Sequence, residues 1–316
     1  MDDFRKLDLD ALMSLEVEDI TPDEIKIVSD KNLFKADMKK AKDGVYSAIL
    51  RFLPNPVNPK DSRLEVKRHY LKGEKGGTYF VCPSTVGLPD SFIQKAFWEF
   101  HNKFKATEDP VAKVIKDNLS RNDSFYSLVY VVKDDCNPDN TGKIMVFNYT
   151  KVINKKIMDE LNPSQKDIDD GTKVKTDVFS LAKGRNFSLK VETSSFGIID
   201  YKNSTFVLNT SPFALELKTK DNITNSQEVM DKLKELYATT PNLREIYGYK
   251  EWAEEQTHEA KRLVAYITGQ DVRDGERLQV KDAPSSRKVI ATALAEPTAS
   301  DTDADDELIA YLNASS

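Results

Sequence analysis

SFYSLVYVVKDDCNPDNTGKIMVFNYTK, residues 124–151, contains the clearest strand signal in the chain. Its two ends, 124–134 and 143–151, are rich in aromatic and β-branched residues, which favour strands. The segment between them, DCNPDNTG (135–142), is rich in the Asn, Pro, Asp and Gly residues typical of turns. The sequence therefore predicts two strands joined by a turn-rich loop.

Similar strand patterns lie on both sides of these residues. Aromatic and β-branched residues alternate with polar ones at 45–54, 63–71, 78–83, 186–193 and 200–209. Segments 63–71 and 78–83 are expected to form a hairpin around GEKGG, because glycine tolerates the positive φ of tight turns.

Helices are predicted where apolar residues recur at helical spacing. These segments are 89–100, 110–119, 154–161 and 225–268, the last broken near Pro241. Together the patterns predict an α+β, β-rich fold, which we interpret as an OB-fold core, a five-stranded Greek-key barrel, with helical insertions.

The net charge of −6 is distributed unevenly along the 316 residues. Residues 1–30 carry −7 and residues 297–316 carry −5, which leaves +6 for the residues between them. We therefore expect an N-terminal arm over 1–30, a basic core over 31–270 and a flexible acidic tail over 271–316.

The sequence offers little for catalysis. It has no GxxxxGK[ST] or GxGxxG loop for phosphate and no GxSxG nucleophile turn. Asp134, Asp135 and Asp139 form the nearest approach to a magnesium site, but beside an Asn/Pro/Gly turn they are more typical of turn formers. A protein without enzymatic activity is favoured, and a metal-dependent nuclease is the last alternative.

Cysteine content and hydropathy point to a reducing compartment. Two cysteines, Cys82 and Cys136, are too few for a disulfide framework, so both are expected to be reduced. The sequence shows neither a signal peptide nor an apolar run of membrane-spanning length. We therefore expect an intracellular protein that does not contact a membrane.

Aromatic and basic residues are interleaved along the predicted strands. Single-stranded nucleic acid needs this combination, because cations bind phosphates and flat rings stack on unpaired bases. About two thirds of strand aromatics are expected to pack in the core. Phe125 and Tyr126 are adjacent and must point to opposite faces, so one of them is expected in a binding groove. The candidate contacts are Arg51, Lys67, Arg68, Arg121, Phe125, Tyr126, Lys133, Lys143, Phe147, Tyr149, Lys151 and Tyr201.

Several segments resemble, in order and spacing, the gene-32-type single-stranded-DNA-binding proteins of T4-like bacteriophages. The resemblance covers about residues 45–206 and implies an OB-fold that coats single-stranded DNA cooperatively in replication, recombination and repair, in the cytoplasm of the host cell. The segments are YSAILRFLP, His69 with Cys82, CPSTVGLPDS, SFYSLVYVVKDD, NTGKIMVFNYTK and DVFSLAKGRNFSLKV.

The resemblance also implies roles for individual residues. SRNDSFY (120–126) matches the family's basic and aromatic contact segment, although Asn122 and Asp123 replace two bases. Arg51, Phe147 and Tyr201 match contact positions. Arg5 and Lys6 match an element for self-association, and an acidic tail that recruits replication proteins is represented by Asp301, Asp303, Asp305, Asp306 and Glu307.

Members of the family hold a structural zinc ion with one His and three Cys. His69 and Cys82 match the first two positions, whereas Phe92 and Lys95 stand at the other two and cannot bind zinc. We therefore expect no cofactor, with His69 and Cys82 as remnants of a zinc site and with apolar packing around Phe92 in place of the metal.

A second hypothesis belongs to a different class. An OB-fold module for protein interaction would use the same basic surface to bind an acidic partner protein. Stacking does not distinguish DNA from RNA, so the residues leave that preference open.

Overall fold

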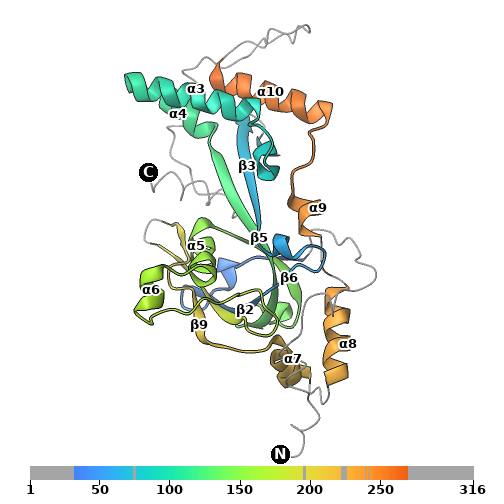
Figure 1. Ribbon diagram of the computed structural model, residues 1–316. Coiled ribbons are helices and arrows are strands. Elements are labelled where there is room, and N and C mark those ends of the chain that lie inside the picture. Colours follow the sequence, from blue (N-terminus) through green and yellow to red (C-terminus); the bar gives the residue numbers. More distant parts are fainter. Residues whose placement is uncertain are drawn as a thin grey trace, which may run out of the picture. The chain divides into compact units, whose positions relative to one another are not determined.

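The structure is a computed structural model (Figure 1) that describes residues 32–73, 76–194, 197–221, 226–238, 240 and 242–269. These residues form two compact units. The first unit contains residues 32–64 and 125–247, and the second contains residues 65–124 and 248–269. The predictions for the N-terminal arm, with Arg5 and Lys6, and for the acidic tail lie outside the described residues.

The first unit is built on a β-sheet. Its strands follow the order β1–β6–β5–β2–β7–β8, and β9 also pairs with β7. β1 runs parallel to β6, whereas the other pairs in this path are antiparallel. The strands are β1 Leu33–Phe34, β2 Val45–Leu53, β5 Arg121–Asp134, β6 Ile144–Tyr149, β7 Arg185–Thr193, β8 Ile199–Asp200 and β9 Thr205–Thr210.

Strand β2 is the central strand of this sheet. Leu50 lies opposite Val131 of β5 on one side and Phe187 of β7 on the other. The register with β5 shifts between Ile49 and Leu50, which marks a β-bulge or irregularity there. From Leu50 onwards every residue of β2 is buried, so both faces of the strand are covered.

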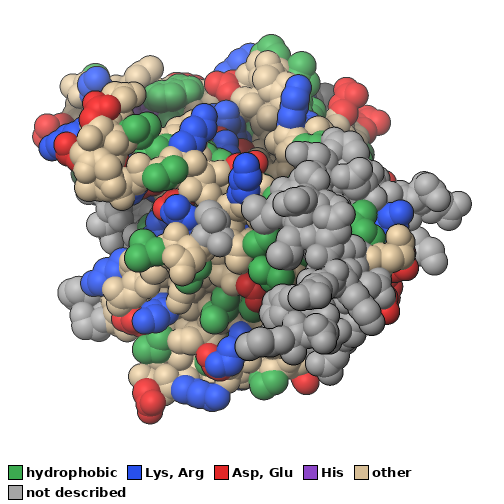
Figure 2. All heavy atoms as spheres, turned by 60° about the horizontal axis from the view of Figure 1, so that its bottom comes forward, with side chains coloured by type: hydrophobic (Ala, Val, Ile, Leu, Met, Phe, Trp, Pro, Cys, Tyr) green, Lys and Arg blue, Asp and Glu red, His purple; other side chains and the backbone are tan. Residues whose placement is uncertain are grey.

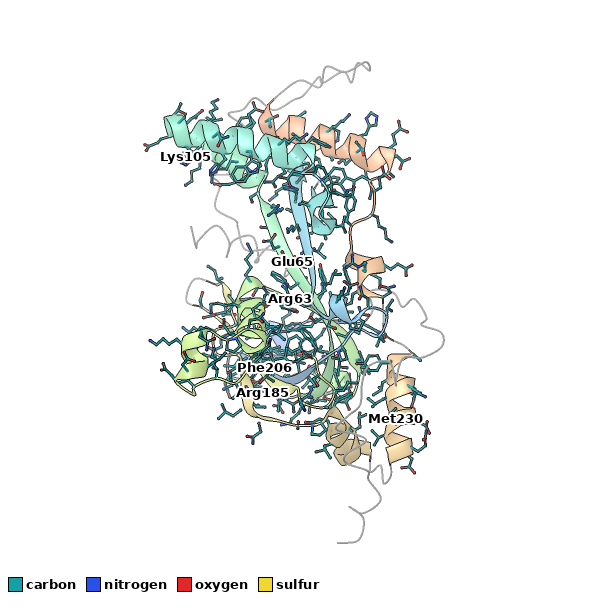
Figure 3. All side chains as sticks on the ribbon, in the orientation of Figure 1. Arg63, Glu65, Lys105, Arg185, Phe206 and Met230 are labelled. Carbon is teal, nitrogen blue, oxygen red and sulfur yellow. The ribbon has the colours of Figure 1, made fainter. Side chains whose placement is uncertain are left out.

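An aromatic cluster fills the core of the first unit. The ring of Phe52 is its centre, and Figure 3 shows the dense group of side chains around Phe206. The ring centroids of five neighbours lie 5.7–6.4 Å from that of Phe52, mostly edge to face, which is a favourable geometry for aromatic pairs. These neighbours are Phe147, Tyr149, Phe179, Phe187 and Phe206.

Helices and short 3-10 turns connect the strands of the first unit, and three further helices follow its last strand. The segment 154–161 that was predicted to be helical lies within α5, and α8 and α9 occupy the start of the helical segment predicted over 225–268. The elements are η3 Met38–Lys40, η4 Pro59–Arg63, η6 Pro138–Asn140, α5 Lys151–Leu161, α6 Gln165–Asp169, α7 Phe213–Asp221, α8 Ser226–Tyr237 and α9 Leu243–Tyr247.

The second unit packs a hairpin against three helices. The hairpin pairs β3 (Leu64–Gly73) with β4 (Gly76–Val81), as the glycines of GEKGG predict. The helices are α3 Phe92–Thr107, α4 Pro110–Asn118 and α10 Glu254–Thr268, and the 3-10 turn η5 (Pro83–Val86) follows β4. Figure 1 shows α3 and α10 side by side.

The second unit has its own apolar core. Ile93 and Phe100 lie on one face of α3, and Leu263 and Ile267 lie on one face of α10, each pair at helical spacing. The basic core predicted over 31–270 contains two apolar clusters in the described residues. Two form because α10, far along the chain, covers the hairpin together with α3 and α4.

The structure confirms the α+β, β-rich class and most of the predicted elements. One predicted strand, 200–209, is instead the end of β8 followed by β9. Lys151, expected at the end of a strand, is the first residue of α5, because β6 ends at Tyr149 and Thr150 takes the extended conformation of an N-cap.

Candidate nucleic-acid interface

Four of the five aromatic rings predicted to contact bases lie in the interior of the first unit. Phe125, Tyr126, Phe147 and Tyr149 are each at most 4% exposed. Phe147 and Tyr149 belong to the aromatic cluster around Phe52. In this structure they offer no face to a base, so these predicted contacts are corrected to core positions.

Phe125 and Tyr126 point to opposite faces of β5, as their adjacency requires, but both faces are covered. Phe125 stacks on Tyr149 with centroids 5.9 Å apart and an interplanar angle of 18°. Tyr126 stacks on Tyr247 of α9 at 4.2 Å and 13°. The prediction that one of these two residues faces a binding groove is wrong, because Tyr247, from a distant part of the chain, stacks on the ring of Tyr126.

Arg51 is a structural residue rather than a phosphate contact. Its side chain is fully buried, and its Nη2 donates to the carbonyls of Ser180 (3.0 Å) and Ser211 (2.8 Å), with Leu181 O at 3.4 Å. Burial lowers the pKa of Arg51 to about 10, and the nearby Glu216 opposes this shift. The prediction that Arg51 binds DNA is therefore corrected, because its guanidinium fastens two loops to β2.

The other predicted cations remain at the surface. Lys143 and Lys151 are exposed, and Lys133 is 61% exposed with Asp135 at 2.7 Å. Lys67, Arg68 and Arg121 are half-buried, and Arg121 Nε lies 3.6 Å from Asp123 Oδ1. Figure 2 shows one face of the molecule, on which Lys and Arg side chains lie among hydrophobic ones.

Tyr201 is the one predicted ring that stays partly exposed. It rests on the aromatic core and lies next to Lys202, whose side chain is 74% exposed. Lys156 Nζ of α5 donates to Lys202 O at 3.0 Å, which brings a second cation to the same place. Tyr201, Lys156 and Lys202, here called the Tyr201 surface, combine a ring with two cations.

Tyr70 and Tyr79 were not among the predicted contacts. The hairpin register places them opposite each other, and Arg68 Cζ lies 4.2 Å from the Tyr79 ring centroid. A signal for this arrangement was present in the sequence, because a tight turn at GEKGG fixes which residues of the two strands face each other.

His69 and Cys82 are both buried in the second unit. His69 is buried with Nδ1 at 2.9 Å from Leu119 O, so Nδ1 carries the proton. Burial raises the pKa of the Cys82 thiol to about 12, which keeps it protonated at neutral pH. The described residues contain no cluster of three or more His, Cys, Asp or Glu able to hold a metal ion. The donor set therefore does not fit structural zinc.

Phe92 packs where the resemblance places a zinc ligand. Its ring lies 5.9 Å from that of Trp252, which also contacts Phe80 at 5.6 Å. Trp252 Nε1 donates to Val81 O at 2.9 Å, so this indole is held against β4. Lys95 is exposed. The predicted apolar packing of Phe92 is confirmed, and the absence of zinc stays a prediction.

We expect the stability of the protein to fall as the pH is lowered from about 6.5 towards 4. Burial lowers the pKa of His69 to about 4 in the folded state, against about 6.5 when unfolded. Between these values the unfolded chain binds more protons, so protonation favours unfolding by about 2 kcal/mol at about pH 5 and has no effect above about 7.5. Melting temperatures recorded at several pH values between about 4 and 7.5 measure this loss of stability. His69→Gln keeps a donor for Leu119 O but does not titrate, and an unchanged pH profile in that variant would rule His69 out.

The carboxylates of the nuclease alternative have structural partners. Both oxygens of Asp134 accept hydrogen bonds, from Tyr46 Oη, Asn140 Nδ2 and the backbone N–H groups of Cys136 and Asn137. Asp135 pairs with Lys133, and Asp139 is exposed in the 3-10 turn η6. Asp134 therefore organises the β5–β6 turn, as the turn-former interpretation predicts.

Comparison with known proteins defines the class. A family model described as "gp32 DNA binding protein like" matches residues 42–261, which reach into both units. Because this match spans most of the chain, the protein belongs to the gp32-like DNA-binding proteins, a family of DNA-binding proteins and not of enzymes.

Two individual proteins are also similar in sequence to this chain. Two proteins named "Single-stranded DNA-binding protein", from Enterobacteria phage T4 and Enterobacteria phage T2, are each 30% identical to this chain over 186 residues. The alignments cover 56% of this chain and 55% of each relative, so the chain spans about half the length of the relatives it matches. Across the described helices, none is long and apolar enough to cross a membrane.

Proposed function

We propose that this protein binds single-stranded DNA without reading its sequence, through cations on phosphates and rings on unpaired bases. The observation that carries the proposal is the match of a DNA-binding family over residues 42–261. The names of the two phage relatives support single-stranded DNA as the ligand.

The Tyr201 surface supports this proposal in the first unit. Its ring is anchored on the core beneath it, so it loses little freedom when a base stacks on it. Lys156 supplies positive charge beside the ring, where the phosphate of a stacked nucleotide would lie. Lys202 adds a second cation, which forms a surface ion pair with Asp200 at 3.7 Å. Lys143 and Lys151 add exposed cations in the same unit.

Finer features of the family belong to this proposal as well. We propose that the antiparallel strands of the first unit form an OB-fold barrel, and that the arm with Arg5 and Lys6 gives cooperative coating of DNA. The acidic tail would recruit replication and recombination proteins and compete with DNA for the cations. The role would be DNA replication, recombination and repair of a bacteriophage in the host-cell cytoplasm, without a bound metal.

Titration of fluorescently labelled oligo(dT) by anisotropy tests the proposal. We expect binding whose affinity falls with salt, with a log–log slope of about −0.7 for each phosphate neutralised. Tyr201→Ala should weaken binding by about 1–3 kcal/mol, whereas Tyr201→Phe keeps the ring and the affinity. Removal of residues 297–316, with their five acidic side chains, should tighten binding at low salt.

The result also decides between the two hypotheses. An anisotropy that stays flat with oligo(dT) at low salt would refute DNA binding and favour a module that binds an acidic partner protein. Affinity unchanged by removal of the tail would refute competition by the tail alone.

A further inference from the structure

The hairpin of β3 and β4 has one sealed face and one accessible face. His69 lies opposite Phe80, and both are buried together with Leu71 beneath the helices of the second unit. Tyr70 lies opposite Tyr79 on the other face, and both tyrosines are half-exposed. The core of this unit is therefore complete without the two tyrosines.

The side chains on the accessible face form a layered group. The rings of Tyr70 and Tyr79 have centroids 4.7 Å apart at an angle of 45°. Arg68, two residues before Tyr70 and on the same face, places its guanidinium 4.2 Å from the Tyr79 ring centroid. A guanidinium at this distance from a ring makes a cation–π contact, so Arg68 covers the Tyr79 ring when no DNA is bound.

Gly77 makes room for this arrangement. A Cβ atom at Gly77 would lie 2.0 Å from Tyr70 Cζ and 2.1 Å from Tyr70 Oη. The ring of Tyr70 therefore lies directly over the backbone of Gly77, and a larger residue would push it aside. Gly77 is not one of the glycines with positive φ, so glycine is needed here for space and not for backbone conformation.

The charge of the hairpin matches a polyanion. Residues 64–81 contain four basic residues, Lys67, Arg68, Lys72 and Lys75, against two acidic ones, Glu65 and Glu74. Lys72 is exposed and, like Arg68 and Tyr70, lies at an even position of β3 and so on the accessible face.

The geometry points to a nucleotide-binding site on this face, which we call the hairpin face (Arg68, Tyr70, Lys72 and Tyr79). An unpaired base of single-stranded DNA takes the place of the Arg68 guanidinium on the Tyr79 ring, and Arg68, released from the ring, binds the adjoining phosphates together with Lys72. A ring pair with flanking cations is what sequence-independent binding of single strands requires. This inference rests on the proposed function and adds a site to it in the second unit.

Two ligands separate stacking from charge. One is oligo(dT), and the other is an abasic oligonucleotide of the same length, which keeps the phosphates but lacks bases. With the full chain, Tyr79→Ala should weaken oligo(dT) binding by roughly 5- to 150-fold and leave the abasic ligand nearly unaffected. Arg68→Gln should weaken both ligands and reduce the salt slope by about 0.7.

Gly77→Ala tests the site without removing any ring or charge. The added methyl group displaces Tyr70, so oligo(dT) binding should weaken while abasic binding does not change. Thr78→Ala is the matched control, because Thr78 is an exposed neighbour that alternates with Tyr79 and lies on the other face. Circular dichroism and the melting temperature show that each variant is folded.

The outcomes distinguish this inference from the proposed function. If the wild-type chain binds oligo(dT) and both Tyr79→Ala and Gly77→Ala bind it equally well, the hairpin face is not a binding site and the proposed function stands. If Tyr79→Ala weakens both ligands equally, base stacking on this face is refuted. If the wild-type chain binds neither ligand, both proposals fail together.

Discussion

Arg51→Ala is expected to lower the free energy of unfolding by roughly 3 to 5 kcal/mol. Arg51 is the largest fully buried side chain among the described residues, and its removal leaves a cavity beside β2. The carbonyls of Ser180 and Ser211 lose their charged donor at the same time. Amide hydrogen exchange in β2 and β7 measures the loss directly, as weaker protection than in the wild type.

Lys133 on the neighbouring strand β5 is a matched control for Arg51, because it is a basic residue at the surface. Lys133 lies opposite Ile49 but is 61% exposed, and its pair with Asp135 is a surface ion pair. Lys133→Ala should therefore change stability by less than about 1 kcal/mol. A folded, fully stable Arg51→Ala protein with weakened DNA binding would contradict the structural role and restore Arg51 as a phosphate contact.

Asp134→Ala is expected to lower the free energy of unfolding by roughly 2 to 4 kcal/mol. The carboxylate accepts from Tyr46 Oη at 2.6 Å and from the backbone N–H of Asn137 at 2.8 Å, and both Asp134 and Tyr46 are buried. Burial and the hydrogen bond to Asp134 together raise the pKa of Tyr46. Without Asp134, the Tyr46 hydroxyl stays in the interior with its acceptor removed, which is more costly than losing an exposed hydrogen bond. Urea denaturation measures the change.

A double-mutant cycle with Tyr46→Phe isolates this contact. Tyr46→Phe removes the donor and its need for a partner, so Asp134→Ala should cost less in the Tyr46→Phe background than in the wild type. Strictly additive costs would show that the hydrogen bond contributes nothing. A loss of magnesium-dependent DNA cleavage in Asp134→Ala, with stability unchanged, would instead revive the nuclease alternative.

Local sequence patterns were sufficient to predict most elements of the fold. The β5 and β6 strands follow from dense β-branched and aromatic residues with turn formers between them. The hairpin follows from the glycines of GEKGG, and α4 follows from apolar residues at helical spacing over 110–119. The structure adds the N-cap of α4, because Asp109 accepts from Val111 N at 2.9 Å ahead of Pro110. The division into two units did not follow, because it depends on α10 covering residues far earlier in the chain.

The candidate contacts were harder to predict, because a strand pattern does not show how many faces of the sheet are covered. The alternation around Phe147 and Tyr149 is typical of a strand with one exposed face. In the structure both faces of this part of the sheet are covered. The ring of Tyr126 is covered by the stacked ring of Tyr247. The two residues are more than a hundred positions apart, so no local sequence pattern indicates this contact. For Tyr201, a position at the edge of the sheet after the short strand β8 leaves part of the ring exposed.

Both tryptophans of the chain, Trp98 and Trp252, belong to the second unit. Selective excitation of indole therefore observes that unit alone, with Trp98 about half exposed to solvent and Trp252 held against β4. The aromatic cluster of the first unit contains phenylalanine and tyrosine but no indole, and it is optically silent under those conditions. The native chain thus carries its own spectroscopic label, and a denaturation curve recorded by tryptophan emission describes the hairpin and its helices, not the sheet.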